Sequence, residues 1–356
     1  MTLAASAFLA SLLGNDEVSS MLGTEADIAA MLKFEAALAR AEVSLGMVSA
    51  EAATAIENAC RVFVPDMRKL TDATARDGVV VPELVRQLRT AVGPKHGNAV
   101  HLGATSQDVI DTALALKLVP VLDLFESRLN NLVSALDSLI VRYGANPLMG
   151  RTRMQAAIPI TVADRLNAWR SPIVRLLGDL PRQREAILIL TLAGAAGTAE
   201  KFGDSIGAVG TAMAADLGLG VPDYVPHTDR SRMADFASHL SLVTGALGKI
   251  GQDIALMVQT GIGEISLSGG GASSAMPHKQ NPVAAEVLVT LARYNAVQLS
   301  GMHQALVHEQ ERSGAAWTLE WLILPQMLEA TGCALQHAEA LLTSIVDIGS
   351  RTGSAD

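Results

Sequence analysis

Apolar residues recur in steps of three and four along three long stretches of the chain. One row is Leu122, Phe125, Leu129, Leu132, Leu136 and Leu139, the second is Val162, Leu166, Trp169, Ile173, Leu176 and Leu180, and the third is Phe236, Leu240, Val243, Leu247, Ile250, Ile254 and Met257. A period near 3.5 over several heptads predicts long helices that pack almost parallel to one another. Prolines at 120 and 172 are expected to kink the first two helices.

Two more long helices are expected towards the C-terminus, from Pro282 to about Arg312 and from Thr318 to about Ile348. We find no alternating strand pattern of useful length. The chain is therefore predicted to be all-α, with a central bundle of five long helices over residues 104–350 and a tail at 351–356.

The first 103 residues predict a small N-terminal domain of short helices and loops. Thr24, followed by acidic residues, has the features of a helix start, and Gly46 those of its end. A second short helix is expected after Ser49. The stretch 77–101 is expected to be broken by its prolines and glycines, which are Pro82, Gly93, Pro94 and Gly97.

Composition narrows the possible functions. Hydrophobic residues make up 49% of the 356, aromatic residues only 3%, and the mean hydropathy is +0.30. No apolar run reaches the roughly 18–20 residues of a membrane helix, so we interpret the excess as surface buried between subunits. The net charge of -9 argues against a nucleic-acid partner. Two cysteines make no disulfide framework, and no basic residue precedes Lys33, so we expect a cytoplasmic protein without a signal peptide.

The segment from Gly269 to Pro282, GGGASSAMPHKQNP, is the strongest candidate for chemistry. A lysine close to a helix N-terminus makes an anion site, and such a field would stabilise a serine alkoxide. The alternative is a Gly/Ser linker with a helix cap.

Residues 273–282, SSAMPHKQNP, resemble the loop motif S-S-x-M-P-x-K-x-N-P of the fumarase/aspartase superfamily. In that superfamily the first serine removes the proton alpha to a carboxylate. The resemblance implies that Ser273 is the catalytic base or its conjugate acid. It also implies a group of substrate-binding residues in this segment, namely Ser274, Met276, Lys279 and Asn281.

Three other segments carry the same resemblance. His101–Asp108, HLGATSQD, resembles H-x-G-x-T-S-x-D, and Gly150–Gln155, GRTRMQ, resembles G-R-T-x-x-Q. The sequence from His308 to Pro325 resembles the E-R-S and S-x-E-R-x-x-L-P region of adenylosuccinate lyases. The implied substrate-binding residues are His101, Thr105, Ser106, Arg153, Gln155 and Arg312. Taken alone, Thr105 and Ser106 fit helix caps, His101 a structural histidine, and Arg312 a helix-surface salt bridge.

Three departures from the lyase motifs indicate which branch of the superfamily the chain resembles. Arg153 stands where those lyases carry a catalytic histidine, residues 76–80 hold no histidine, and Trp321 replaces an arginine. Arginine cannot shuttle protons near neutral pH. Loss of the histidines with Ser273 retained is similar to the bacterial 3-carboxy-cis,cis-muconate cycloisomerases. Family members continue into a third helical domain, which we expect to be truncated or absent here.

The resemblance implies an isomerase of the protocatechuate branch of the beta-ketoadipate pathway. One substrate carboxylate adds within the same molecule to give 4-carboxymuconolactone, so the substrate is a small polycarboxylate and no cofactor or metal is needed. A homotetramer with each site built from three subunits is also implied. Two alternatives stay open, a C–N or C–O lyase of the same superfamily and a non-catalytic helical scaffold.

Overall fold

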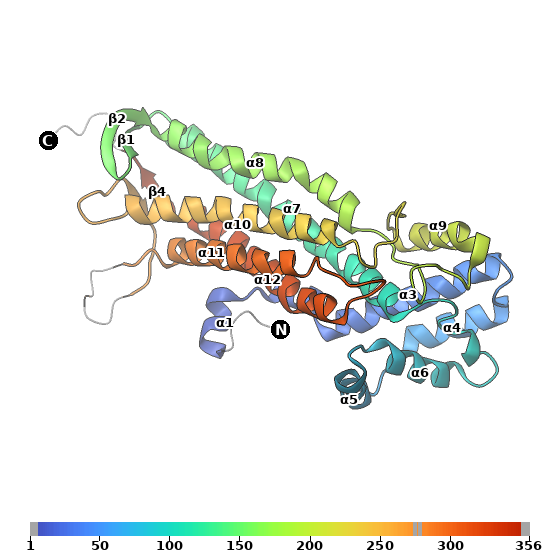
Figure 1. Cartoon of the computed structure of the whole chain (residues 1–356). Helices are drawn as coiled ribbons and strands as arrows, with labels where there is room; N and C mark the ends of the chain where they lie inside the picture. The colour runs from blue at the N-terminus through green and yellow to red at the C-terminus, as the bar shows by residue number, and fades with distance from the viewer. Residues whose placement is uncertain (1–5, 273–275, 277–279, 350–356) are drawn as a thin grey trace.

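The computed structural model describes residues 6–272, 276 and 280–349. Most of this part of the chain is helical, and five long helices run side by side as a bundle (Figure 1). They are α7 (Ser106–Tyr143), α8 (Val162–Ile187), α10 (Ser231–Met257), α11 (Val283–Gln304) and α12 (Gly314–Thr343). The prediction of an all-α protein built on long, nearly parallel helices is confirmed.

Short helices surround one end of the bundle (Figure 1). They are α3 (Thr24–Ser44), α4 (Ala50–Val62), α5 (Met67–Asp77), α6 (Val81–Val92) and α9 (Ile206–Leu217), with 3₁₀ turns at Gly97–Ala99 and Gly203–Ser205. The chain reaches them through α1 (Ala7–Leu13) and α2 (Asp16–Met21).

Local sequence signals explain several of these boundaries. The Ser49 hydroxyl accepts a hydrogen bond from the Ala52 amide at 3.1 Å, so the predicted start of α4 is confirmed. Pro82 was expected to break the chain, and this was wrong. It lies in the first turn of α6, where a missing backbone N–H leaves no helix hydrogen bond unmade.

Two clusters of buried side chains hold the structure together. The larger fills the bundle and includes Leu132, Trp169, Phe236 and Leu328. The smaller is centred on α3 and includes Phe34, Leu38 and Ile56, with Val109 of α7 and Val209 of α9. Since α7 contributes to both clusters, it is the rigid link between them. The predicted domain division at residue 103 stays a prediction.

Four short strands were missed in the sequence. β1 (Pro147–Thr152) pairs antiparallel with β2 (Gln155–Thr161), and β3 (Ile265–Leu267) pairs with β4 (Ile345–Ile348). Most of β2 is exposed to solvent, and so are several residues of β1. A strand pair without a buried face carries no alternation of apolar and polar residues, which removes the signal that was sought.

The ends of the last two helices also differ from the prediction. α11 ends at Gln304 rather than near Arg312, and an irregular segment follows. The Ser313 hydroxyl then accepts from the Ala316 amide at 3.1 Å and starts α12, which gives way to β4 before Ile348. Among the described helices, none has the length and apolar character needed to span a membrane.

Candidate active site

The N-terminus of α7 is fixed by a buried carboxylate. Thr105 is the residue before the helix and Ser106 the first residue in it. The Thr105 amide donates to Asp108 Oδ2 at 3.0 Å, and the amides of Ala193 and Gly194 donate to the same carboxylate at 2.9 and 3.0 Å. Capping therefore accounts for the placement of Thr105, while the side chains of Thr105 and Ser106 lie half-buried at a positively polarised helix end.

Arg312 lies beside this helix start. Its Nε donates to Gln107 Oε1 at 2.8 Å, and one terminal nitrogen donates to the Ala195 carbonyl at 3.2 Å. The expected alternative, a salt bridge on a helix surface, is wrong, because Arg312 lies outside the helices and both acceptors are neutral. Its remaining N–H groups can bind a carboxylate.

A cluster of buried charged residues, centred on Arg230, lies next to Gln107 in the interior of the protein. Arg230 donates to Asp111 Oδ2 at 2.6 Å and, through Nε, to Glu320 Oε2 at 3.0 Å. The Trp317 indole donates to Asp111 Oδ1 at 3.2 Å. Burial alone would lower the pKa of Arg230, but the two carboxylates outweigh it and raise that pKa, so the guanidinium stays charged.

Most of this cluster was not predicted from the sequence. Asp108 belongs to the recognised motif, and Asp111 follows it by three residues on the same face of α7. Arg230 and Glu320 lie far away along the chain. Only the packing of α7, α10 and α12 shows that they meet.

His101 lies in the turn that leads into α7. Its Nδ1 atom is 2.7 Å from Oε1 of Glu35, a buried residue of α3. Burial alone would lower the pKa of His101, but the charge and hydrogen bond of Glu35 together with the charge of Asp108 outweigh burial and raise it. The turn also needs Gly103, where φ is +74° and a Cβ atom would lie 2.8 Å from Phe202 Cζ.

Arg153 and Gln155 lie at the opposite end of the bundle. Arg153 and Met154 form the two-residue turn between β1 and β2, with φ values of 49° and 67°. Positive φ at both positions is the geometry of a tight hairpin turn. The ion pair between Arg151 and Glu264, at 2.9 Å, joins the hairpin close to this turn to the segment that follows α10. Arg153 and Gln155 themselves are exposed.

The serine-containing segment begins and ends at this same end of the molecule. The backbones of Gly271 and Asn281 exchange two hydrogen bonds of 2.9 Å each, just before α11 starts at Val283. Asn281 is half-buried there, and Met276 is exposed. Ser273, Ser274 and Lys279 lie outside the described residues.

One chain therefore divides the predicted site residues into two groups. His101, Thr105, Ser106 and Arg312 lie in or beside the start of α7, whereas Arg153 and Gln155 lie in the β1–β2 hairpin and Asn281 lies just before α11. Figure 1 shows the start of α7 and the β1–β2 hairpin at opposite ends of the bundle. The 38 residues of α7 between the groups span about 57 Å at the helical rise. No small molecule can contact both groups of one chain.

Comparison with known proteins identifies the family to which this fold belongs. The sequence profile of a family described as Lyase matches residues 14–297. The chain belongs to this lyase family. It is 40% identical over 321 residues to the 3-carboxy-cis,cis-muconate cycloisomerase of Pseudomonas aeruginosa, covering 88% of this chain and 70% of that protein. It is 38% identical to the enzyme of the same name from Pseudomonas putida, over 88% of this chain and 76% of that protein.

Comparison with solved structures shows the same relationship. The 3-carboxy-cis,cis-muconate lactonizing enzyme from Pseudomonas putida matches with a TM-score of 0.90 and 36% identity, over 96% of this chain and 77% of that one. The fumarate lyase from Mesorhizobium sp. BNC1 matches with a TM-score of 0.88 and 31% identity, over 95% and 76%. The predicted resemblance to the fumarase/aspartase superfamily is thereby confirmed.

Within the lyase fold, a cavity of about 300 Å³ follows the α7 face that starts at Ser106. Ile110, Leu114 and Lys117 line it from α7, and Trp321 lines it from α12. Lys117 is paired with Asp27, so the one lysine that lines this cavity is already neutralised. Most of the residues that line the cavity are apolar.

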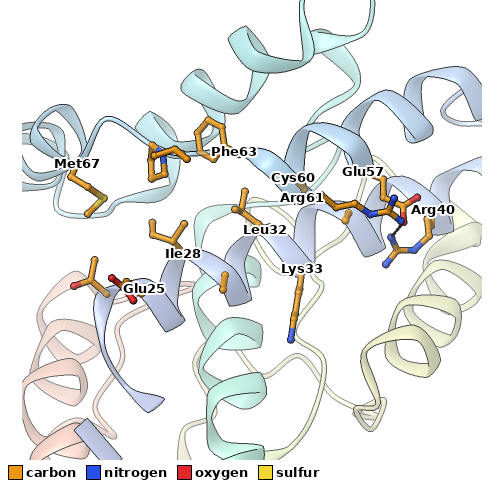
Figure 2. Close-up of a pocket in the computed structure, with 15 residues that line it drawn as sticks. Glu25, Ile28, Leu32, Lys33, Arg40, Glu57, Cys60, Arg61, Phe63 and Met67 are labelled. Atoms are coloured by element: carbon orange, nitrogen blue, oxygen red, sulfur yellow. Dashed lines mark hydrogen bonds and ion pairs between the residues drawn. The ribbon is translucent and has the colours of Figure 1, made fainter. Parts of the chain in front are cut away.

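A larger groove of about 890 Å³ lies on the outside of α3 and α4 (Figure 2). Ile28, Leu32 and Phe63 line its apolar part, and Arg40 pairs with Glu57 at 3.3 Å along one side. Its lining comes from α3, α4 and the segment 63–67, and includes none of the predicted site residues. Among the described residues, no group of His, Cys, Asp and Glu is arranged to hold a metal ion.

Proposed function

We propose that this chain is a 3-carboxy-cis,cis-muconate cycloisomerase. The observation that carries the proposal is Arg153 at the tip of the β1–β2 hairpin. It stands where the lyases that the sequence resembles carry a catalytic histidine, and a guanidinium does not release its proton near neutral pH. The similarity to the cycloisomerases of two Pseudomonas species supports the same assignment.

An intramolecular addition explains why a titrating group is dispensable at position 153. One carboxylate oxygen of the substrate attacks an alkene carbon, and a new C–O bond closes the lactone ring. The electron pair of the double bond moves to the carbon alpha to another carboxylate, where a proton completes a new C–H bond. No leaving group departs, so no general acid has to protonate one. No cofactor is required, since the substrate supplies both reacting groups.

The residues then divide into two tasks. Ser273, in its assigned role, delivers the proton. The cations and hydroxyls hold the three carboxylates and stabilise the charge that develops on the carboxylate next to the new C–H bond. Arg153 acts from one group, and His101, Thr105, Ser106 and Arg312 act from the other. Lys279, in its assigned role, supplies a further cation. Asn281 and Gln155 add neutral contacts.

We infer that the complete site forms between subunits of a cytoplasmic homotetramer. Support comes from the two separated groups of residues and from apolar side chains left exposed on the bundle. Val141, Leu242 and Val297 are 88%, 62% and 73% exposed in the single chain. Such residues on three long helices are suited to burial against other copies.

Mixing two impaired variants tests the shared site. Arg153→Ala and Arg312→Ala change opposite ends of the molecule, so a mixed oligomer contains some sites with both arginines intact. We expect activity to return on subunit exchange, in about a quarter of the sites if mixing is random. The matched control mixes Arg312→Ala with Thr105→Ala, which change the same end and should not rescue each other. A monomer by light scattering, or no rescue in the first mixture, contradicts the shared site.

The reaction itself is tested by ultraviolet absorbance. Loss of the conjugated diene of 3-carboxy-cis,cis-muconate should follow addition of the purified protein, with 4-carboxymuconolactone as the product by mass spectrometry and NMR. The second candidate is a C–N or C–O lyase, which the description of the family favours. Adenylosuccinate tests this alternative in parallel. Turnover of adenylosuccinate without turnover of the muconate would overturn the proposal.

A further inference from the structure

We infer that Gln107 is a positioning residue, which fixes the Arg312 guanidinium in the orientation needed to bind a substrate carboxylate. The inference rests on the proposed function and adds a residue to its binding apparatus. Gln107 follows Ser106 in the first turn of α7 and is fully buried. A buried amide that serves only packing is replaceable by an apolar side chain, whereas this one contacts a residue of the site.

The hydrogen bonds of Gln107 define which way its amide faces. Nε2 donates to the His227 carbonyl at 2.7 Å and to Asp111 Oδ2 at 3.3 Å. Since these acceptors take the NH₂ group, Oε1 must face the other way, and there it accepts from Arg312 Nε at 2.8 Å. A reversed amide would place NH₂ against a guanidinium and lose all three bonds.

The support behind Gln107 is itself rigid. His227 Nε2 lies 2.8 Å from Asp108 Oδ1, and both side chains are buried. Asp111, the other acceptor, is held by Arg230 at 2.6 Å. Gln107 therefore connects Arg312 to an interior network that cannot rotate freely.

The bond to Nε has a specific consequence for recognition. Arg312 lies in the irregular segment between α11 and α12, where no helix constrains its long side chain. Gln107 binds Nε and the Ala195 carbonyl binds one terminal nitrogen at 3.2 Å, so the plane of the guanidinium is determined. The remaining N–H groups are therefore already oriented before the substrate arrives. Binding a carboxylate then costs little further rotational freedom of the Arg312 side chain. Lysine at position 312 would have no Nε–H for Gln107 to hold.

A double-mutant cycle on kcat/KM for 3-carboxy-cis,cis-muconate tests this role. Gln107→Met keeps the size of the side chain and removes its polar atoms, and we expect a loss of roughly tenfold or more, because a hydrogen bond to a charged group is removed. In an Arg312→Ala background the same change should cost less than about twofold, since the group to be positioned is gone. Equal losses in both backgrounds would overturn the inference.

Two controls separate positioning from folding. Gln183 is also buried, and it donates to Asp179 of α8 and to Asp235 of α10. Gln183→Met should leave kcat/KM unchanged. If Gln107→Met fails to fold, Gln107→Asn serves instead, since it keeps an amide in the buried network while its carbonyl oxygen, one methylene shorter, no longer reaches Arg312 Nε. That variant should raise KM more than it lowers kcat, because the guanidinium that binds the carboxylate is no longer held in place. A loss confined to kcat would count against the inference.

A readout independent of turnover distinguishes failure here from failure of the proposed function. The Arg312 Nε–H signal in ¹⁵N NMR, assigned with Arg312→Lys, should be protected from solvent exchange in the wild-type protein and in Gln183→Met. It should lose that protection in Gln107→Met. Unchanged protection would overturn the positioning role, whatever reaction the enzyme catalyses. Absence of muconate turnover with protection lost would overturn only the proposed function.

Discussion

Nδ1 of His101 lies 2.7 Å from Oε1 of Glu35, and the Glu35 side chain is only 1% exposed. The pair joins the turn before α7 to the middle of α3. Although burial lowers the pKa of His101, the charge and hydrogen bond of Glu35 together with the charge of Asp108 outweigh it, so the imidazole keeps its proton to higher pH than a free histidine. An imidazolium at this position adds a positive charge to the group of residues that includes Arg312.

Glu35→Gln should lower the pKa of His101. In the wild-type protein the pair contributes stability that is fully present below the unfolded pKa near 6.5 and is lost as pH rises through the raised folded pKa. In the variant, burial is opposed less strongly, so the proton leaves at lower pH. The alkaline limb of kcat/KM should move to lower pH, and NMR titration of the ring should show the same shift. An unmoved His101 titration would contradict this account.

Arg153→Ala should lower kcat/KM by roughly one to two decades, because a charged hydrogen bond to a carboxylate is worth about 1.5–3 kcal/mol. Arg153→Lys should also reduce it, since an ammonium cannot form paired bonds. Arg153→His should create no lyase activity. Melting should hardly change, since Arg153 is exposed at the hairpin tip.

The neighbouring Arg151 is the control for Arg153. Arg151 pairs with Glu264 at 2.9 Å, so Arg151→Ala should loosen the hairpin and affect stability more than Arg153→Ala does. If Arg153→Ala changes kcat/KM by less than about twofold, Arg153 has only a structural role, and the main residue-level argument against a lyase is lost.

Ser273→Ala should abolish turnover while melting temperature and oligomer size stay nearly unchanged, because the serine is assigned to proton transfer rather than to packing. Ser268→Ala is the matched control. The Ser268 hydroxyl donates to the Ser344 carbonyl at 3.2 Å, so its loss should leave kcat intact. More than a tenth of wild-type kcat in Ser273→Ala would remove this residue from the chemistry.

Glu42→Gln should stabilise the protein more at pH 8 than at pH 5. Glu42 is fully buried, and burial followed by the nearby charge of Glu35 raises the pKa of its carboxyl to about 8. Between the unfolded pKa near 4.5 and that value, only the unfolded state loses the proton, so wild-type stability falls as pH rises. The variant escapes this loss, which is on the order of a few kcal/mol.

Glu83 provides the opposite case. The hydrogen bond from Arg86, followed by that from Gln87, lowers the pKa of Glu83 to about 2, so Glu83→Gln should lose stability at neutral pH rather than gain it. Urea unfolding of both variants at the two pH values measures the difference. Parallel pH profiles for wild type and Glu42→Gln would show that Glu42 titrates normally.

Gly103→Ala should be more damaging than Gly78→Ala. Both glycines have φ near +75°, so an alanine suffers the same backbone strain at either position, about 1 kcal/mol. Only at Gly103 does the added Cβ collide with Phe202, since the space around Gly78 is open. The extra loss should appear in melting temperature and in kcat/KM, because the turn positions His101 and Ser106. Equal effects at both positions would show that Phe202 moves aside.

The sequence by itself determined the helical architecture, and it predicts which groups react. The rows through Leu132, Leu166 and Leu247 predict α7, α8 and α10 because helix packing needs one apolar stripe per helix. Ser49 fixes the start of α4 because a cap acts within four residues. These signals are local, so they survive without any knowledge of the fold.

Only the tertiary structure decided how those groups are arranged. The β1–β2 turn at Arg153 and Met154 has positive φ values but contains no Gly or Asn, the residues that usually indicate such a turn. The hairpin therefore has no local sequence signature. Asp111, Arg230 and Glu320 come together over separations of 119 and 90 residues, and Gln107 meets Arg312 over 205. Such contacts depend on how whole helices pack together. A buried charged group needs a partner, and the packing decides which distant residue lies close enough to be that partner. The length of α7 likewise puts the two groups of predicted site residues at opposite ends of the bundle.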